Sequence, residues 1–268
     1  MKISTIQFTL LLAVGSASML CFSILVKSML GAERTTDAEE SNHNPYVTDG
    51  LIAMWDGEWN IGLGIHDSSS PVWVDLVGGY DVNLTSHGSF SDKALVCDGI
   101  GCAASANDGI FLDRNIVRTV EICFIASSSV GIITSLSIYG LGQTAETGTI
   151  AIRMKNTGTL GLFCMIVNSS SEGKASCITN FQNMNEVLSV SCLYDNNDFI
   201  GSYVNGEYRT PSYSFFGQAV RRISFGGRTH DTDIPWQGRI FSVRVYDRNL
   251  TEDEIAHNLH IDEERFGQ

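Results

Sequence analysis

Short apolar or alternating runs, separated by turn residues, recur along the chain from Tyr46 onward. Alternation with a period of two places successive side chains on opposite faces of a β-strand. The Gly, Asn, Asp and Ser clusters between the runs favour turns. No helical period appears before residue 251, so the pattern predicts one all-β domain, a sandwich or barrel. Strands are predicted at 51–55, 72–76, 94–97, 109–112, 118–126, 131–138, 149–155, 160–167, 187–194, 199–204, 222–225 and 239–246.

The last predicted strand, 239–246, shows the alternation clearly. Phe241, Val243 and Val245 fall on one face, and Arg244 falls on the other with the remaining, mostly polar, residues. This is the pattern of a strand that buries one face. A second local signal lies at Asn205-Gly206, a type I′ turn pair that predicts a hairpin with the strand at 199–204.

A capped helix is predicted directly after this strand. Thr251 suits the N-cap, and Glu254 stands three residues later, which is the spacing of a capping box. Leu250 before the cap and Ile255 after it suit a hydrophobic staple. The chain is therefore predicted to close with a long strand and a short helix.

The N-terminal segment has a different character. Residues 6–26 contain no charge and follow Lys2, and a membrane helix needs roughly 20 apolar residues. The small residues Ser16, Ala17 and Ser18 also fit a signal-peptide cleavage site. Both alternatives, an uncleaved membrane anchor and a cleaved signal peptide, place the rest of the chain outside the cytoplasm. The predicted organisation is 1–32 signal peptide or anchor, 33–46 polar linker and 47–268 one β domain.

Charge and cysteine content narrow the function classes. The net charge is −13, so nothing would neutralise phosphates and a nucleic-acid partner is excluded. The cysteines lack the CxxC spacing of zinc or redox motifs. Cys123 and Cys192, like Cys164, lie in strand-like runs and are predicted to be small buried residues. Cys97 and Cys102 are alternatively able to close a disulfide loop in an exported domain.

Four ordered stretches of the chain carry a family resemblance. They are 49–66, with DGLIAMWDG and a glycine-rich loop; 73–81, with Trp73 and Asp75; 194–207, which ends at the Asn205 turn; and 238–267. Together they resemble the laminin-G-like, concanavalin A-like jelly-roll domains of bacterial and phage surface proteins. The resemblance implies a two-sheet antiparallel jelly-roll sandwich with a short C-terminal helix, here preceded by one N-terminal hydrophobic helix. It also implies binding of glycans or proteins, in loops at one rim or on the concave face, in some relatives with calcium.

Candidate ligand-binding residues combine loop aromatics, which stack on sugars, with polar groups that bond hydroxyls. The loop 226–236 mixes all of these residue types. Hard oxygen ligands on loops suit Ca²⁺, so acidic loop residues are candidate metal ligands. The predicted ligand-binding residues are Trp59, Tyr80, Tyr208, Arg228, His230, Asp231, Asp233 and Trp236, and the predicted calcium ligands are Asp56, Asp75 and Asp98.

An enzymatic role is not predicted. A glycoside hydrolase needs two carboxylates that flank the scissile bond, and Glu121 has no acidic neighbour on its own strand face. The prediction is a non-catalytic extracytoplasmic module that binds carbohydrate or a cell-surface partner. The alternatives are a structural or adhesive surface component, cellular or phage-derived, without a small ligand, and a glycoside hydrolase on the same fold.

Overall fold

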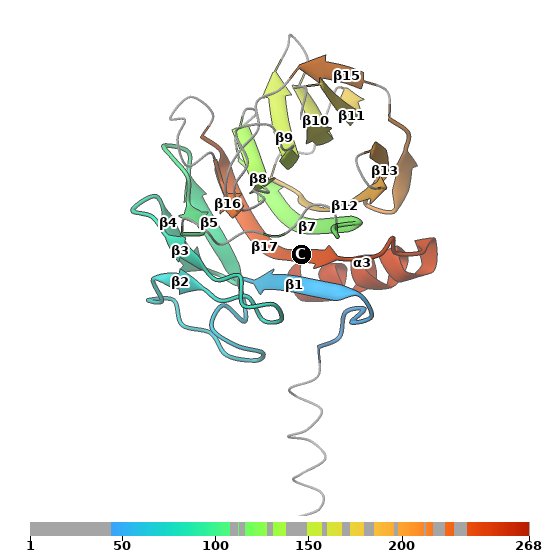
Figure 1. Ribbon diagram of the computed structural model, residues 1–268. Coiled ribbons are helices and arrows are strands. Elements are labelled where there is room, and N and C mark those ends of the chain that lie inside the picture. Colours follow the sequence, from blue (N-terminus) through green and yellow to red (C-terminus); the bar gives the residue numbers. More distant parts are fainter. Residues whose placement is uncertain are drawn as a thin grey trace, which may run out of the picture. The chain divides into compact units, whose positions relative to one another are not determined.

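The computed structural model describes residues 44–107, 112, 116–127, 131–137, 149–156, 160–167, 172–179, 185–195, 198–211, 213–216, 223–227 and 235–267. They belong to one compact unit, Asn44–Gln268. In this part of the chain the strands form two antiparallel sheets, and one helix follows the last strand (Figure 1). The predicted fold class is therefore confirmed for the β domain.

The predicted targeting segment, 1–32, with its uncharged stretch 6–26, lies outside the described residues. Within the described ranges no helix is long and apolar enough to cross a membrane. The anchor, the signal peptide and the domain boundaries at 32 and 46 all stay predictions.

The first sheet, called the helix-side sheet because the helix packs on it, is organised around two long strands. These are β7 (Thr119–Ala126) and β17 (Gln237–Tyr246), which pair along their whole length. On its other side, β17 pairs first with β5 and then with β1, which is added to the sheet where β5 ends. The remaining strands of this sheet are β14 (Glu207–Arg209), β13 (Asp198–Val204), β12 (Val187–Asp195), β5 (Ala94–Asp98), β4 (Gly88–Ser91) and β1 (Leu51–Asp56).

The second sheet lies across the core from the first. Its described strands follow the order β15 (Tyr213–Phe216), β11 (Glu172–Thr179), β10 (Leu160–Val167), β9 (Thr149–Asn156), β8 (Gly131–Ser137), β16 (Ile223–Phe225), β6 (Ala104–Ser105), β3 (Val82–Leu84) and β2 (Val72–Trp73). Several of the short strands, such as β3, β4 and β6, fall outside the predicted runs. Short strands carry too few residues for an alternation to be read.

The hydrophobic core fills the space between the two sheets. Ile122 and Val243 come from the helix-side sheet, whereas Trp73, Ile152 and Phe225 come from the second sheet, and all five are fully or almost fully buried in one cluster. Burial of such side chains stabilises a fold by about 1.5–3 kcal/mol each. The core thus joins the two sheets into a sandwich, as predicted.

Strand β17 departs from the prediction in two ways. It is buried on both faces, because the helix covers the side that carries Arg244 and Tyr246. A bulge between Ile240 and Ser242 also shifts the alternation. Phe241 therefore lies on the helix side, stacked on Phe266 at 4.9 Å between ring centroids, and not beside Val243. The predicted single buried face was wrong because the sequence pattern does not show which face the helix covers.

The closing helix α3 (Glu252–Phe266) begins as predicted. The Thr251 hydroxyl accepts a hydrogen bond from the Glu254 N–H, and the Glu254 carboxylate accepts one from the Thr251 N–H, so the capping box is complete. Leu250 and Ile255 pack in one buried cluster with Tyr246, which is the predicted staple. Figure 1 shows α3 lying along β17 and β1.

The structure also describes the predicted hairpin at Asn205-Gly206 and four of the cysteines. Asn205 and Gly206 have φ of 46° and 79° and connect β13 to β14, which confirms the turn. Cys123 and Cys192 are buried, as predicted, and Cys123 carries a free thiol. Cys97 and Cys102 are also free and buried, so the alternative disulfide is not formed.

Candidate functional site

The predicted loop aromatics occupy different settings. Trp59 is partly buried, and the Arg265 guanidinium lies over its ring at 3.7 Å from the centroid. Tyr80 is also partly buried and packs against the core. Trp236 is fully buried. Of the four predicted aromatics in the described residues, Tyr208 is the exposed one, at 46%.

Tyr208 lies next to a second tyrosine. It is the direct cross-strand partner of Tyr203, and the two ring centroids are 5.1 Å apart. Its ring lies over Gly201, where an added Cβ would come within 2.6 Å of the Tyr208 hydroxyl oxygen. Tyr203 in turn packs against the cluster under the first turns of α3. The pair forms an aromatic surface at the β13–β14 edge, on the helix side of the sheet.

The first predicted calcium ligand, Asp56, is bound to protein groups. Its carboxylate accepts hydrogen bonds from both Arg265 Nη atoms, at 2.7 and 3.0 Å, and from the backbone N–H groups of Glu58 and Trp59. Asp56 is completely buried, and burial raises the pKa of its carboxyl while Arg265 opposes that shift. Its role in the structure is to start a turn and to hold the end of α3.

The second predicted calcium ligand, Asp75, also bonds the backbone. One oxygen accepts from the N–H groups of Met54 and Val77, and the other from those of Gly78 and Tyr80, at 2.8–3.1 Å. This arrangement fixes the turn after β2 against β1, as a turn-forming aspartate does.

The third, Asp98, lies in another loop, where it bonds His87 Nδ1 at 2.8 Å and the Ile100 N–H. Asp56, Asp75 and Asp98 are therefore not brought together. No group of three or more His, Cys, Asp or Glu side chains able to hold a metal occurs in the described part of the chain. Calcium binding stays a prediction.

The predicted rim loop is described only at its ends. Arg228, His230, Asp231 and Asp233 lie outside the described residues. At the base of the loop, the Trp236 N–H donates to the Gly226 carbonyl at 3.1 Å. The role of Arg228, His230, Asp231 and Asp233 as ligand-binding residues stays a prediction.

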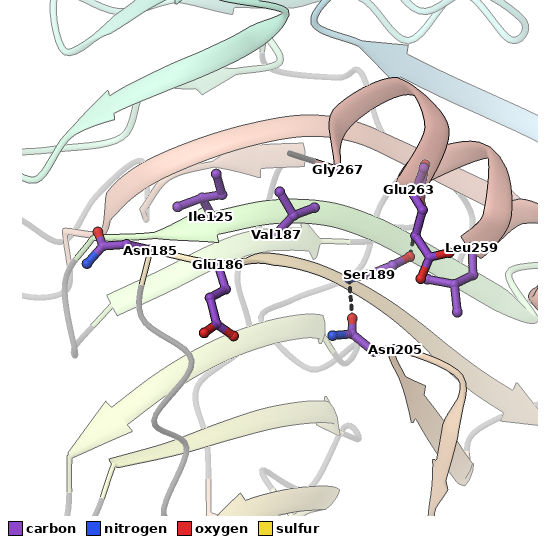
Figure 2. A pocket seen from close by; sticks show the side chains of 10 residues that line it. Ile125, Asn185, Glu186, Val187, Ser189, Asn205, Leu259, Glu263 and Gly267 are labelled. Atoms are coloured by element: carbon purple, nitrogen blue, oxygen red, sulfur yellow. Dashed lines mark hydrogen bonds between the residues drawn. The ribbon is translucent and has the colours of Figure 1, made fainter.

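A cavity of about 330 Å³ lies between the C-terminal half of α3 and the outer face of the helix-side sheet (Figure 2). Its size is at the lower end of the range for small-molecule sites, roughly 300–1,000 Å³. The lining comes from β7, the start of β12, the β13–β14 turn and α3. The lining residues are Ile125, Asn185, Glu186, Val187, Ser189, Asn205, Leu259, Asp262, Glu263 and Gly267.

The cavity begins at the point where β13 ends beside β12. The Ser189 N–H donates to Asn205 Oδ1, and the Ser189 carbonyl accepts from the Asn205 N–H, both at 2.9 Å, so the turn closes on β12 at this residue. Because hydrogen-bonding groups alternate along a strand, the N–H and carbonyl of Val187 point to the same side, past the end of β13. Leu259 contacts the turn at Gly206 and forms the opposite wall.

The cavity combines an apolar wall with polar groups. Ile125, Val187 and Leu259 supply the apolar surface. Asn185, with φ of 66° at the start of β12, and the exposed Glu263 on α3 supply groups that bond hydroxyls. This mixture suits a small polar ligand with apolar faces.

An ionic network of buried residues lies behind the cavity. Asp262, which lines the cavity, is 1% exposed and holds the Arg244 guanidinium through two hydrogen bonds of 2.8 Å. Its oxygens also accept from the hydroxyls of Ser189 and Tyr46, each at 2.9 Å. The network thereby ties the cavity wall on α3 to strand β12 and to the start of the domain.

The second carboxylate of this network is Glu121. It accepts from Arg244 Nε at 3.0 Å, from the Ser191 hydroxyl at 2.8 Å and from Asn258 Nδ2 at 2.7 Å. Although burial works against the charged guanidinium, Asp262 and Glu121 raise the pKa of Arg244 above its ordinary value. The hydrogen-bond partners of Glu121 thus come from β12, β17 and α3.

Sequence reasoning missed the cavity and its network. The available signals were Arg244, the one charged residue between Ile240 and Tyr246, and Asn258 and Asp262 four residues apart on the predicted helix. They place polar groups on one helix face and one strand face. Their meeting depends on which sheet face the helix covers, and that is a property of the whole fold.

No protein-family model and no curated protein matches the sequence. Among solved structures, the fold is similar to that of Trypanosoma rangeli sialidase in complex with sialic acid, with a TM-score of 0.54 and 13% identity over 91% of this chain and 39% of that one. It is also similar to domain 4 of AbnA, a GH43 extracellular arabinanase from Geobacillus stearothermophilus, in complex with arabinotriose. That match has a TM-score of 0.50 and 16% identity over 78% of this chain and 97% of that one.

The chain thus spans about two fifths of the sialidase chains that it matches. The fold is one that carbohydrate-active proteins use, while the finer laminin-G-like assignment stays a prediction. The finding contradicts our prediction that the chain is not an enzyme, because enzyme chains contain this fold. Catalytic groups can also come from different strands and loops, so the lack of an acidic neighbour beside Glu121 on its own strand does not exclude catalysis. At this level of identity, the likeness extends to the fold alone.

Proposed function

We propose that this chain binds carbohydrate and that the cavity between α3 and β12 holds the sugar. One observation supports this proposal most strongly. A single cavity of about 330 Å³ has both an apolar wall and exposed groups that bond hydroxyls. A pyranose or furanose ring presents both kinds of surface, since its C–H faces are apolar and its rim carries hydroxyls. Val187 and Leu259 contact the face of the ring, while Asn185 and Glu263 bond its hydroxyls.

The fold supports this proposal. Domain 4 of the arabinanase, nearly all of which matches this chain, was solved with arabinotriose. The two proteins share a scaffold at 16% identity, so the site itself is argued from this chain's own residues.

The tyrosine pair extends the proposed site. Tyr203 and Tyr208 flank the Asn205–Gly206 turn and lie on the side of it away from the cavity. They are on the same face of the sheet as the cavity. Aromatic rings stack on the apolar faces of sugars, and an exposed tyrosine also offers its hydroxyl. In this proposal, a glycan longer than one unit continues from the cavity onto Tyr208.

The proposed location is outside the cytoplasm, as the uncharged segment 6–26 predicts. Glycans at cell surfaces and in secreted polymers are accessible there. N-terminal sequencing of the protein recovered from cells distinguishes a cleaved signal from a retained anchor.

The experiment is a glycan-array screen of the full chain, followed by calorimetry with the glycans that bind and an assay of released reducing sugar. We expect binding to at least one class of oligosaccharide. Glu263→Gln removes a charged acceptor at the cavity and is expected to weaken binding about tenfold, because hydrogen bonds to charged groups contribute about 1.5–3 kcal/mol.

The matched control is Glu264→Gln, the same change one residue further along α3, at an exposed residue outside the cavity lining. It is expected to leave affinity unchanged. Equal affinities of the two variants would place the glycan elsewhere, and an array without any bound glycan would contradict the proposed function.

A further inference from the structure

The charged side chains among the described residues of the cavity lining are all negative. Of the ten described residues that line it, three are acidic, namely Glu186, Asp262 and Glu263, and none is Lys, Arg or His. The cavity, and not these charges, makes the site. The charges determine which ligands it accepts.

The nearby cations do not reverse this sign. Arg244 bonds Asp262, but it also bonds Glu121, so one buried guanidinium is shared by two buried carboxylates. Arg239, the cross-strand neighbour of Ile125, is paired with Asp92 at 2.9 Å. These two arginines are thus matched or outnumbered by carboxylates.

Arg265, near the end of α3, is engaged in the same way. It bonds Asp56 at 2.7 Å and Glu58 at 3.0 Å. The exposed Glu263 is therefore not balanced by a cation of the cavity lining. Desolvating an anionic ligand against carboxylates is costly unless a cation pairs with it.

We propose that the cavity selects glycans without an acid group: sugars that carry no carboxylate, sulfate or phosphate on the unit that enters it. Carboxylates accept hydrogen bonds from hydroxyl and ammonium groups, so neutral sugars and amino sugars both fit the lining. A sialic acid or uronic acid unit would bring its own carboxylate towards Glu263. This inference rests on the carbohydrate binding proposed above and adds the charge class of the ligand.

The test compares oligosaccharides that share one neutral core: the core alone, the core with a terminal sialic acid and the core with a terminal glucosamine. Calorimetry with the full chain is carried out at low ionic strength and again at high salt. We expect the sialylated form to bind at least tenfold more weakly than the neutral one. The difference should shrink in high salt, because the charges are near the surface and are screened.

A charge-reversed pair of variants places the effect at the cavity. Glu263→Lys is expected to bring the affinity for the sialylated form to within about threefold of that for the neutral form, and Glu264→Lys to leave most of the difference in place. Far-UV circular dichroism and unfolding curves check that both variants fold.

The possible failures are distinct. If the neutral core binds and the sialylated form binds equally well or more tightly at low ionic strength, the selectivity is wrong while the glycan-binding proposal stands. Equal effects of the two lysine variants would also overturn it, because the discrimination would then not arise at the cavity. If none of the array glycans binds, the proposed function and this inference fail together.

Discussion

At β7 and β17 the two faces of the helix-side sheet are both buried, yet they consist of chemically different side chains. On the inner face, Ile122 and Val243 pack into the apolar core between the sheets. On the outer face, under α3, their immediate neighbours Glu121 and Arg244 join Asp262 in an ionic network that is 0–1% exposed. One residue along a strand thus separates a hydrophobic contact from a buried charge.

The two faces place different requirements on their side chains. Apolar contacts tolerate side chains of similar volume, whereas a buried carboxylate needs every partner in place. Asp262 belongs to the network and also lines the cavity. The outer face therefore links the position of α3 to the shape of the proposed site.

Breaking the network is expected to give the largest effect. Arg244→Met removes the guanidinium and leaves Glu121 and Asp262 buried without their cation. Removal of one partner of a buried ion pair typically costs about 3–5 kcal/mol. We expect a loss of this size in urea unfolding at neutral pH, together with weaker glycan binding because Asp262 on α3 loses its bonds to Arg244.

The same substitution at Arg239 is the control. Arg239 lies on the same strand, but its side chain is 36% exposed and pairs with the exposed Asp92. Such pairs contribute about 0–1 kcal/mol. A comparable cost for the two methionine variants would refute the distinction between the buried network and ordinary surface charges.

The inner face should respond less to a conservative change. Ile122→Val removes one methylene from a fully buried side chain, and such changes cost about 0.5–1.5 kcal/mol. We expect this loss with unchanged glycan affinity, because Ile122 faces away from the cavity. Altered affinity in a calorimetric titration would show that the two faces are coupled more closely than the structure indicates.

The smallest effect concerns the start of α3. Hydrogen bonds and the ion pair with Arg248 lower the pKa of Glu254 to about 2, from a reference value of 4.5. A lowered folded-state pKa means that this stabilisation is complete above about pH 4.5 and is lost as the pH falls towards 2. The effect is expected to stay below about 1 kcal/mol, because the pair is partly exposed.

Glu254→Gln isolates this contribution. Its stability should converge with that of the native chain between pH 4.5 and pH 2, as measured by thermal unfolding in matched buffers. A constant difference across this interval would mean that Glu254 acts through packing and not through its charge.

Much of the fold was predictable because its signals are local. The alternation in 187–194 and 239–246, the turn at Asn205-Gly206 and the capping box at Thr251 each depend on a few neighbouring residues. The strands, the turn and the capping box formed as predicted, and with them the two antiparallel sheets and the closing helix, whereas the bulge between Ile240 and Ser242 shifts the alternation within β17.

The candidate site was less predictable because it is made by tertiary contacts. Its walls come from Ile125, Val187, Asn205 and Leu259, which lie on four different elements. Loop aspartates and tryptophans were predicted as ligands from residue type, but type alone does not show which donors they meet. In the structure, the carboxylate oxygens of Asp56 accept hydrogen bonds from Arg265 and from backbone N–H groups, and these bonds stabilise the fold.

The most direct test of carbohydrate binding at the cavity is an NMR titration of the ¹⁵N-labelled chain with a glycan from the array. Binding at the cavity predicts saturable amide shifts concentrated at residues 185–189, 205–208 and 259–263, with the Val187 amide among the largest. Shifts confined to the loops around Asp56, Asp75 and Asp98, with the cavity residues unmoved at saturation, would contradict it.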